Sequence, residues 1–259
     1  MNIYQVDAFA EKLFEGNPAA VVPLGKWLPD REMQNIALEN NLSETAFFIE
    51  TDNGFQIRWF TPEAEVDLCG HATLAAAHVL FNHLNYSQSE ILFDSRSGIL
   101  KVKKEGNLII LNFPVSPVSE IEIPVNLVDA FTIKPAKCFS GRDDLMLVFD
   151  NEEDIYQLKP DFQKIIETKT RGIITTARSQ KFDFISRFFA PAVGVNEDPV
   201  TGSAHTMLIP FWSKKLGKTN LTARQVSTRG GNLCCKYLGN RVEIGGKAVT
   251  YLVGEIRST

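Results

Sequence analysis

The chain has 259 residues, of which 44% are hydrophobic and 22% are charged, and its formal net charge is −4. This composition is typical of a globular protein that can bury a full core without disulfide or metal support. The acidic balance argues against a nucleic-acid partner, which needs a concentrated basic surface, and no apolar run approaches the ~18 residues of a membrane span.

The four cysteines favour a reduced, cytoplasmic protein. Disulfide scaffolds are small and dense in cysteine, and this chain is long and contains no Cys-x-x-Cys pair. Cys234 and Cys235 are adjacent, so they would point to opposite faces of a strand. The chain starts directly on a strand-like pattern, so we expect no secretory signal and no membrane partner.

The first half of the chain predicts alternating strands and helices. Apolar alternation and helical periodicity predict strands over 18–22, 45–50 and 55–60, helices over about 30–40 and 71–83, and further strands near 91–95, 98–103 and 108–113. Pro29 suits the first turn of the first helix.

The second half repeats this order at an offset of roughly 130 residues. The sequence RWFTP at 58–62 is echoed by RFFAP at 187–191. The corresponding elements are strands over 145–150, 171–176, 182–189, 225–229, 232–238 and 241–244, and helices over about 161–167 and 203–215.

These echoes predict an internally duplicated α+β protein. We expect half-domains over 1–115 and 116–259, joined by a proline-containing linker near 113–117, with the last strand packing back on the first half. Two similar halves usually face each other, and clefts between domains are preferred sites for small molecules.

Glycines mark the two predicted helix starts, Gly70 and Gly202. A helix N-terminus has exposed N–H groups and about half a positive charge, so it attracts anions. A pair of such starts favours a substrate with a carboxylate. The alternative is that both glycines only allow tight packing.

Ionisable residues cluster near these starts. His71 falls in the first helical turn, where the dipole disfavours the imidazolium form, and so could act as a neutral donor or a proton shuttle. Asp198 precedes the second helix and could be a functional acid or a cap. Glu44 leads into a buried strand, where partial burial would raise its pKa toward that of a general base. We expect His78 and His83 to have structural roles.

Four segments resemble the signature segments of the PhzF-like isomerase family. They are NPAAV at 17–21, LSETAF at 42–47, CGHAT at 69–73 and NEDPVTGSA at 196–204. The resemblance implies a fold like that of diaminopimelate epimerase, in which two homologous halves each curl a sheet around a central helix, with the active site in the cleft between them. It also implies a cofactor-independent enzyme without a metal, whose relatives commonly form dimers.

The resemblance assigns a role to each candidate residue. It implies that Glu44 is the base that transfers the proton and that His71, Asp198 and Ser203 assist it. The remaining residues of the same segments are expected to bind the substrate: Asn17, Gly70, Ala72, Thr201 and Gly202. The best-understood member of the family shifts a proton on a dihydro-hydroxyanthranilate, so we expect a small carboxylate substrate here.

Cys69 leaves a second enzymatic interpretation open. Related epimerases keep a catalytic cysteine at this place, and a thiol at a helix N-terminus would have a lowered pKa. The second half offers Thr201 rather than a partner cysteine, so a two-thiol epimerase would be incomplete. The alternatives are a racemase that uses Glu44 or Cys69 opposite Asp198, and a protein that binds small carboxylates without turnover.

Overall fold

The computed structural model of the protein describes residues 1–257, which divide into two compact units. Unit 1 consists of Met1–Phe113 and the segment from Ile244 onward, and unit 2 is Pro114–Glu243. The boundary near the C-terminus falls inside strand β16 (Arg241–Gly246). Each unit combines a curled sheet with few helices, as the predicted α+β class requires.

The sheet of unit 1 combines antiparallel pairs with two parallel ones. In spatial order its strands are β17 (Ala248–Glu255), β1 (Asn2–Ala8), β2 (Asn17–Leu24), β3 (Glu44–Thr51), β4 (Gly54–Phe60), β6 (Glu90–Ser95), β7 (Gly98–Glu105) and β8 (Leu108–Pro114). The short β5 (Glu65–Val66) pairs with the end of β4. The pairs β2–β3 and β4–β6 are parallel, and parallel neighbours need crossover connections. Helices α1 (Asp30–Asn40) and α2 (Gly70–Asn82) supply them.

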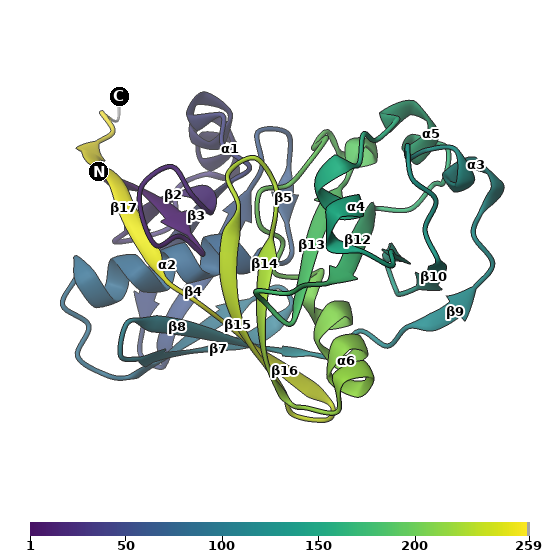
Figure 1. The fold of residues 1–259 in the computed structure, drawn as a ribbon. Helices are drawn as coiled ribbons and strands as arrows, with labels where there is room; N and C mark the ends of the chain where they lie inside the picture. The colour runs from purple at the N-terminus through teal and green to yellow at the C-terminus, as the bar shows by residue number, and fades with distance from the viewer. Residues whose placement is uncertain (258–259) are drawn as a thin grey trace. The chain divides into compact units, whose positions relative to one another are not determined.

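Helix α2 is the central helix of unit 1. Every residue from His71 to Phe81 is buried, and four of them are alanines, which let strands approach closely. A helix that is apolar on all sides belongs in the interior of a protein. Strands β1, β2, β3 and β17 all contact α2, so the sheet curls around it (Figure 1).

Helix α1 covers the other side of strands β2 and β3. Met33 and Ala37 on the helix pack with Val22, Phe47 and Phe60. The helix ends at Asn41, which adopts a left-handed backbone conformation with φ of 49°. This conformation reverses the chain, so that β3 begins only three residues later.

Unit 2 repeats the strand pattern of unit 1. Its spatial order is β9 (Ser119–Ile121), β10 (Lys137–Ser140), β11 (Asp144–Val148), β12 (Gly172–Arg178), β13 (Phe184–Phe189), β14 (Asn220–Gln225) and β15 (Gly231–Tyr237). The parallel pairs β11–β12 and β13–β14 correspond to β2–β3 and β4–β6. The crossovers are α4 (Glu152–Gln157) with α5 (Phe162–Ile166), and α6 (His205–Leu216).

The two echoed sequences make the same contacts in their own units. Arg58 donates through Nε and Nη2 to both carboxylate oxygens of Glu65, each at 2.7 Å. Arg187 donates to Glu197 in the same way, at 2.7 and 3.0 Å. Each guanidinium also lies over the ring of a phenylalanine two residues further along its strand. The repeat in sequence is therefore a repeat in structure.

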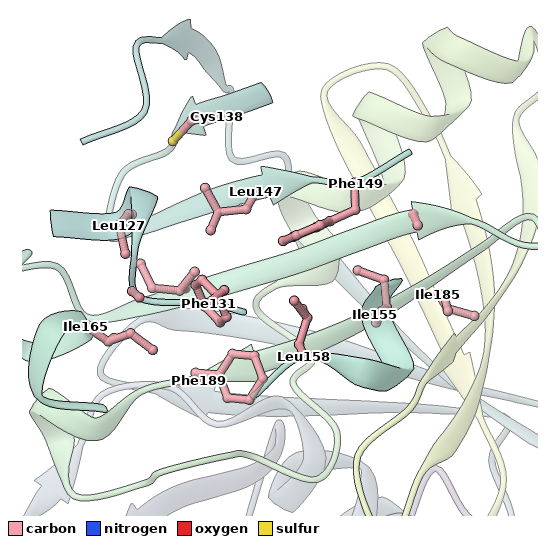
Figure 2. Packing of buried hydrophobic residues seen from close by; sticks show 13 residues of the cluster. Leu127, Phe131, Cys138, Leu147, Phe149, Ile155, Leu158, Ile165, Ile185 and Phe189 are labelled. Carbon is pink, nitrogen blue, oxygen red and sulfur yellow. The ribbon is translucent and has the colours of Figure 1, made fainter. Parts of the chain in front are cut away.

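The core of unit 2 lies between its strands and its short helices. Figure 2 shows Leu147, Ile185 and Phe189 on the strands and Phe149 just after β11, with residues from helices that include α3 (Val125–Val128), α4 and α5 in the same cluster. Each short helix contributes a buried apolar side chain, such as Ile155 in α4. Helices this short are marginal in water, so this packing stabilises them.

Some predicted boundaries were wrong. The strand predicted over 225–229 is β14, which ends at Gln225, because Ser227 holds a turn there by accepting from the N–H of Gly230. The helix predicted from 203 begins at His205. The sequence did not predict α3, α4, β9 or β10, which are too short to show periodicity. No helix within residues 1–257 is long and apolar enough to cross a membrane.

Gly16 and Gly98 give a test of the fold. Both have positive φ, of 68° and 89°, but a Cβ at Gly16 would overlap the carbonyl oxygen of Ala8, whereas one at Gly98 would meet open space. Gly98→Ala should lower the free energy of unfolding by about 1 kcal/mol through backbone strain. Gly16→Ala should lower it by roughly 3 kcal/mol or more. Equal losses in urea denaturation would contradict this packing.

Candidate active site

Four side chains of unit 1 meet where strands β2 and β3 begin. Asn17 is the first residue of β2 and Glu44 is the first residue of β3. The two strands are parallel, with Ala19 beside Glu44, so both starts lie at the same edge of the sheet. Cys69 and His71 come from the start of helix α2. Crossover connections bring these distant parts of the sequence together.

His71 makes a contact on each of its two ring nitrogens. Its Nδ1 lies 3.2 Å from the amide nitrogen of Asn17, and its Nε2 lies 3.2 Å from a carboxylate oxygen of Glu44. An amide nitrogen can only donate, so Nδ1 must be the acceptor in the first contact. The ring proton is therefore on Nε2, the nitrogen that lies 3.2 Å from Glu44, although the two atoms are not aligned as a hydrogen bond.

The imidazole of His71 is neutral near pH 7. Burial lowers its pKa to about 3, because the interior disfavours the charged ring. Its position in the first turn of α2 acts in the same direction, since the helix dipole repels a cation there. His71 therefore lies beside Glu44 as a neutral ring and not as the cation of an ion pair.

The Glu44 side chain is held in place but still reaches the surface. It retains 19% of its exposure, whereas the side chain of His71 retains only 6%. A carboxylate that lies beside a neutral side chain and remains partly exposed is suited to general-base chemistry. The Asn17 amide beside Nδ1 does not titrate, so it cannot take up a proton from the ring.

Cys69 contacts the imidazole at Nδ1. It is buried, and its Sγ is 3.5 Å from Nδ1 of His71. Since Nδ1 is the acceptor, the thiol donates weakly toward it. Cys69 is also the N-cap residue of α2, although its side chain makes no capping hydrogen bond. The thiol therefore supports the same orientation of the ring that Asn17 imposes.

Three of these side chains could also ligate a metal ion. One ligand atom each from Glu44, Cys69 and His71 lie within 4.8 Å of one another. Three ligands are one fewer than a closed tetrahedral site has, so a metal ion bound by this set would keep an open position.

Unit 2 holds a second polar cluster just before helix α6. The hydroxyl of Thr201 donates to the carboxylate of Asp198 at 2.5 Å. Gln225 accepts from the Thr201 backbone N–H at 2.9 Å and donates to the Asp198 carbonyl oxygen at 2.7 Å. His205 contacts the Thr201 carbonyl oxygen through Nδ1, at 2.9 Å. The segment that carries Gly202 is therefore held in one conformation.

Ser203 has a cationic neighbour. The Nη2 of Arg171 donates to its hydroxyl oxygen at 3.1 Å. Arg171 also binds both carboxylate oxygens of the buried Asp144 through Nε and Nη2. The hydroxyl of Ser203 is thus tied to a fixed guanidinium.

The structure groups the predicted residues by unit. Asn17, Glu44, Gly70, His71 and Ala72 lie at the first cluster, in unit 1. Asp198, Thr201, Gly202 and Ser203 lie at the second cluster, in unit 2.

Asp67, His78 and His83 are close in sequence to these segments but lie outside both clusters. The side chain of Asp67 is 74% exposed. His78 and His83 both contact the hydroxyl of Thr250, which agrees with the structural role expected for them.

Sequence reasoning missed Arg171 and Gln225. Arg171 carries the signal that singled out Glu44, a charged residue immediately before a buried strand. We looked for an acidic counterpart of Glu44 at that place, so the arginine was given no role. Gln225 ends a strand and bears no charge, so nothing in the sequence distinguished it.

Comparisons with known proteins identify the family. The sequence model described as Phenazine biosynthesis-like protein matches residues 6–254. An uncharacterized isomerase from Pseudomonas aeruginosa is 50% identical over 256 residues, which cover 99% of this chain and 98% of that protein. A crystal structure of a phenazine biosynthesis protein of the PhzF family from Enterococcus faecalis matches with a TM-score of 0.97 and 47% identity, covering 99% of both chains.

The fold is also found among epimerases. A hydroxyproline epimerase from Agrobacterium vitis matches with a TM-score of 0.63 at 8% identity, covering 98% of this chain and 91% of that one. The fold is thus the one that the sequence resemblance implied. The chain belongs to the PhzF family of phenazine biosynthesis-like proteins.

The buried histidines predict a loss of stability in acid. Burial lowers the pKa of His205 from 6.5 to about 4, so between these values the unfolded chain binds more protons than the folded one. Stability should therefore fall as the pH is lowered through this window. His205→Asn leaves a smaller side chain and should lower Tm at every pH, but its Tm should change less between pH 7 and pH 4.5 than that of the wild type. Parallel curves of Tm against pH would contradict the assignment.

Proposed function

We propose that the protein is a metal- and nucleotide-independent isomerase that transfers a proton on a small carboxylate-bearing metabolite, with Glu44 as the base. The observation that carries this proposal is the contact between the accessible Glu44 carboxylate and the neutral, buried His71. Membership of the PhzF family and the isomerase names of its relatives support the reaction class.

In the proposed reaction, Glu44 removes a proton from a carbon next to a carboxylate or a conjugated system. The C–H bond breaks, an O–H bond forms on Glu44, and the electron pair enters the conjugated system. Glu44 then returns the proton to another carbon, so a double bond moves and no other reactant is needed. His71 is proposed to position the carboxylate of Glu44 through their 3.2 Å contact, and Asn17 keeps His71 in the tautomer with its proton on Nε2.

The remaining residues are proposed to bind and protonate the substrate. The glycines at 70 and 202 leave backbone N–H groups accessible to its anionic groups, with Ala72 and Thr201 beside them. Asp198 and Ser203 are proposed to assist proton transfer. The cysteines at 69, 138, 234 and 235 form no disulfide, which supports a reducing, cytoplasmic setting.

In the racemase alternative, Cys69 or Glu44 exchanges a proton with one face of the substrate and Asp198 exchanges a proton with the other. The position of Cys69 argues against the thiol as the base, because its Sγ is buried and lies against Nδ1 of His71. An epimerase shares this fold, so the racemase reaction is tested as the alternative. A protein that only binds carboxylates would not require an oriented Glu44.

Exchange with solvent tests Glu44 even before the substrate is identified. The small carboxylates of a cell extract are incubated with the protein in D2O and analysed by mass spectrometry for single deuterium gains. The wild type should label at least one metabolite, and Glu44→Gln should label it about 10²–10⁴-fold more slowly. Glu50→Gln, the same change in the same strand, should behave as the wild type.

A Glu44→Gln variant that retained more than about a tenth of the rate would remove Glu44 from the mechanism. The absence of any labelled metabolite would favour the binding protein. Labelling at a stereocentre without movement of a double bond would favour the racemase.

Cys69→Ala separates the two enzymatic alternatives. If Glu44 is the base, this variant loses one small buried side chain and keeps at least about half of the exchange rate, and iodoacetamide reacts slowly with Cys69 because only an accessible thiolate alkylates quickly. Abolished exchange, or rapid alkylation that a carboxylate prevents, would support the cysteine epimerase.

A further inference from the structure

The duplication shows which residues of unit 2 correspond to the Glu44–His71 pair. Strand pairing sets the alignment: in β3 Phe47 pairs with Arg58, and in β12 Thr175 pairs with Arg187. Counting back three residues from Phe47 and from Thr175 aligns Glu44 with Gly172. Since Gly70 aligns with Gly202, His71 corresponds to Ser203, which follows its glycine in the same way.

Unit 2 has replaced the acid by a cation. A Cβ on Gly172 would overlap the ring of Phe188, so no side chain fits where Glu44 has one in unit 1. The guanidinium of the preceding residue, Arg171, lies over that ring, 5.6 Å from its centroid, and contacts Ser203. The acid–histidine contact of unit 1 thus becomes an arginine–serine contact in unit 2.

Asp144 fixes the guanidinium in one orientation. Its carboxylate is 3% exposed and accepts from Nε and Nη2 of Arg171, which is the fork-like geometry that arginine offers a carboxylate. The Arg171 side chain nevertheless retains 39% of its exposure. Because Nη1 makes no hydrogen bond with any part of the chain in residues 1–257, it is the donor that remains for a ligand.

The same contact orients the proton of Ser203. A guanidinium has donors only, so the hydroxyl oxygen of Ser203 must accept from Arg171. The hydroxyl proton therefore points away from Arg171 and has no other acceptor within the described chain. The guanidinium of Arg171 therefore fixes two donors, its own Nη1 and the hydroxyl of Ser203.

We propose that Arg171 and Ser203 form a two-donor clamp for the two oxygens of the substrate's carboxylate, a role that rests on the proposed function and specifies its substrate class. Arg171 is the selectivity-determining residue of the clamp and Asp144 is its positioning residue. Asp144 neutralises the guanidinium, and the charge of Asp198 also acts on it. Selectivity therefore comes from directed hydrogen bonds more than from net charge. A carboxamide fits poorly, because its NH2 group would face a donor.

Benzoate and benzamide test the clamp by calorimetry. They have the same shape, and benzoate carries no proton that the proposed reaction could move, so the result does not depend on turnover. The wild type should prefer benzoate by about tenfold or more, and Ser203→Ala should lower that preference severalfold. Arg171→Met combined with Asp144→Asn removes both charges, so no buried acid is left unpaired, and should abolish the preference.

Two variants control for indirect effects. Glu44→Gln should keep the preference even though it loses deuterium exchange, which separates failure of the clamp from failure of the proposed function. Arg187→Lys changes another carboxylate-bound arginine of unit 2 and should also keep it. No preference in the wild type, or an unchanged preference in Ser203→Ala or in a folded Arg171→Met/Asp144→Asn protein, would overturn the proposal.

Discussion

The contact between His71 and Glu44 joins the start of the central helix of unit 1 to the start of a neighbouring strand, and the chemistry proposed for the protein depends on its charge state. A charged imidazole would form an ion pair with the carboxylate and weaken it as a base. Burial keeps the ring neutral, and the amide of Asn17 places its single proton on Nε2, the nitrogen that lies 3.2 Å from Glu44. The interior position of helix α2 is therefore a condition of the chemistry as well as of the fold.

The duplicated fold explains how one chain can carry two different kinds of site. Both units place a side chain from the start of their central crossover helix next to a residue that leads into a buried strand. In unit 1 these are His71 and Glu44, and in unit 2 they are Ser203 and Arg171. The backbone arrangement is retained, as the arginine–glutamate pairs of the two units also show. The carboxylate and neutral imidazole of unit 1 thus have a guanidinium and a hydroxyl as their counterparts in unit 2.

Much of the fold could be predicted from the sequence, because the apolar periodicity of its longer elements is strong. Helix α1 falls on the predicted residues, and α2 within one residue of them. The glycines and charged residues at element ends also indicated Glu44 and His71. The contacts that define their chemistry join residues far apart in the chain: Asn17 is 54 residues from His71, and Arg171 is 32 residues from Ser203. No local pattern encodes such pairs, so the tautomer of His71 and the role of Arg171 required the structure.

The protonation state of His71 is the most direct test of this account, and nitrogen-15 NMR of the histidine side chains can measure it. At pH 7 the account predicts a neutral ring with its proton on Nε2 and an acceptor signal from Nδ1. The signals of the His71 ring should not titrate between pH 8 and pH 5, since burial lowers the pKa of His71 to about 3. Replacing Asn17 by leucine should disturb this tautomer. An imidazolium at pH 7, or a proton on Nδ1 in the wild type, would contradict the account.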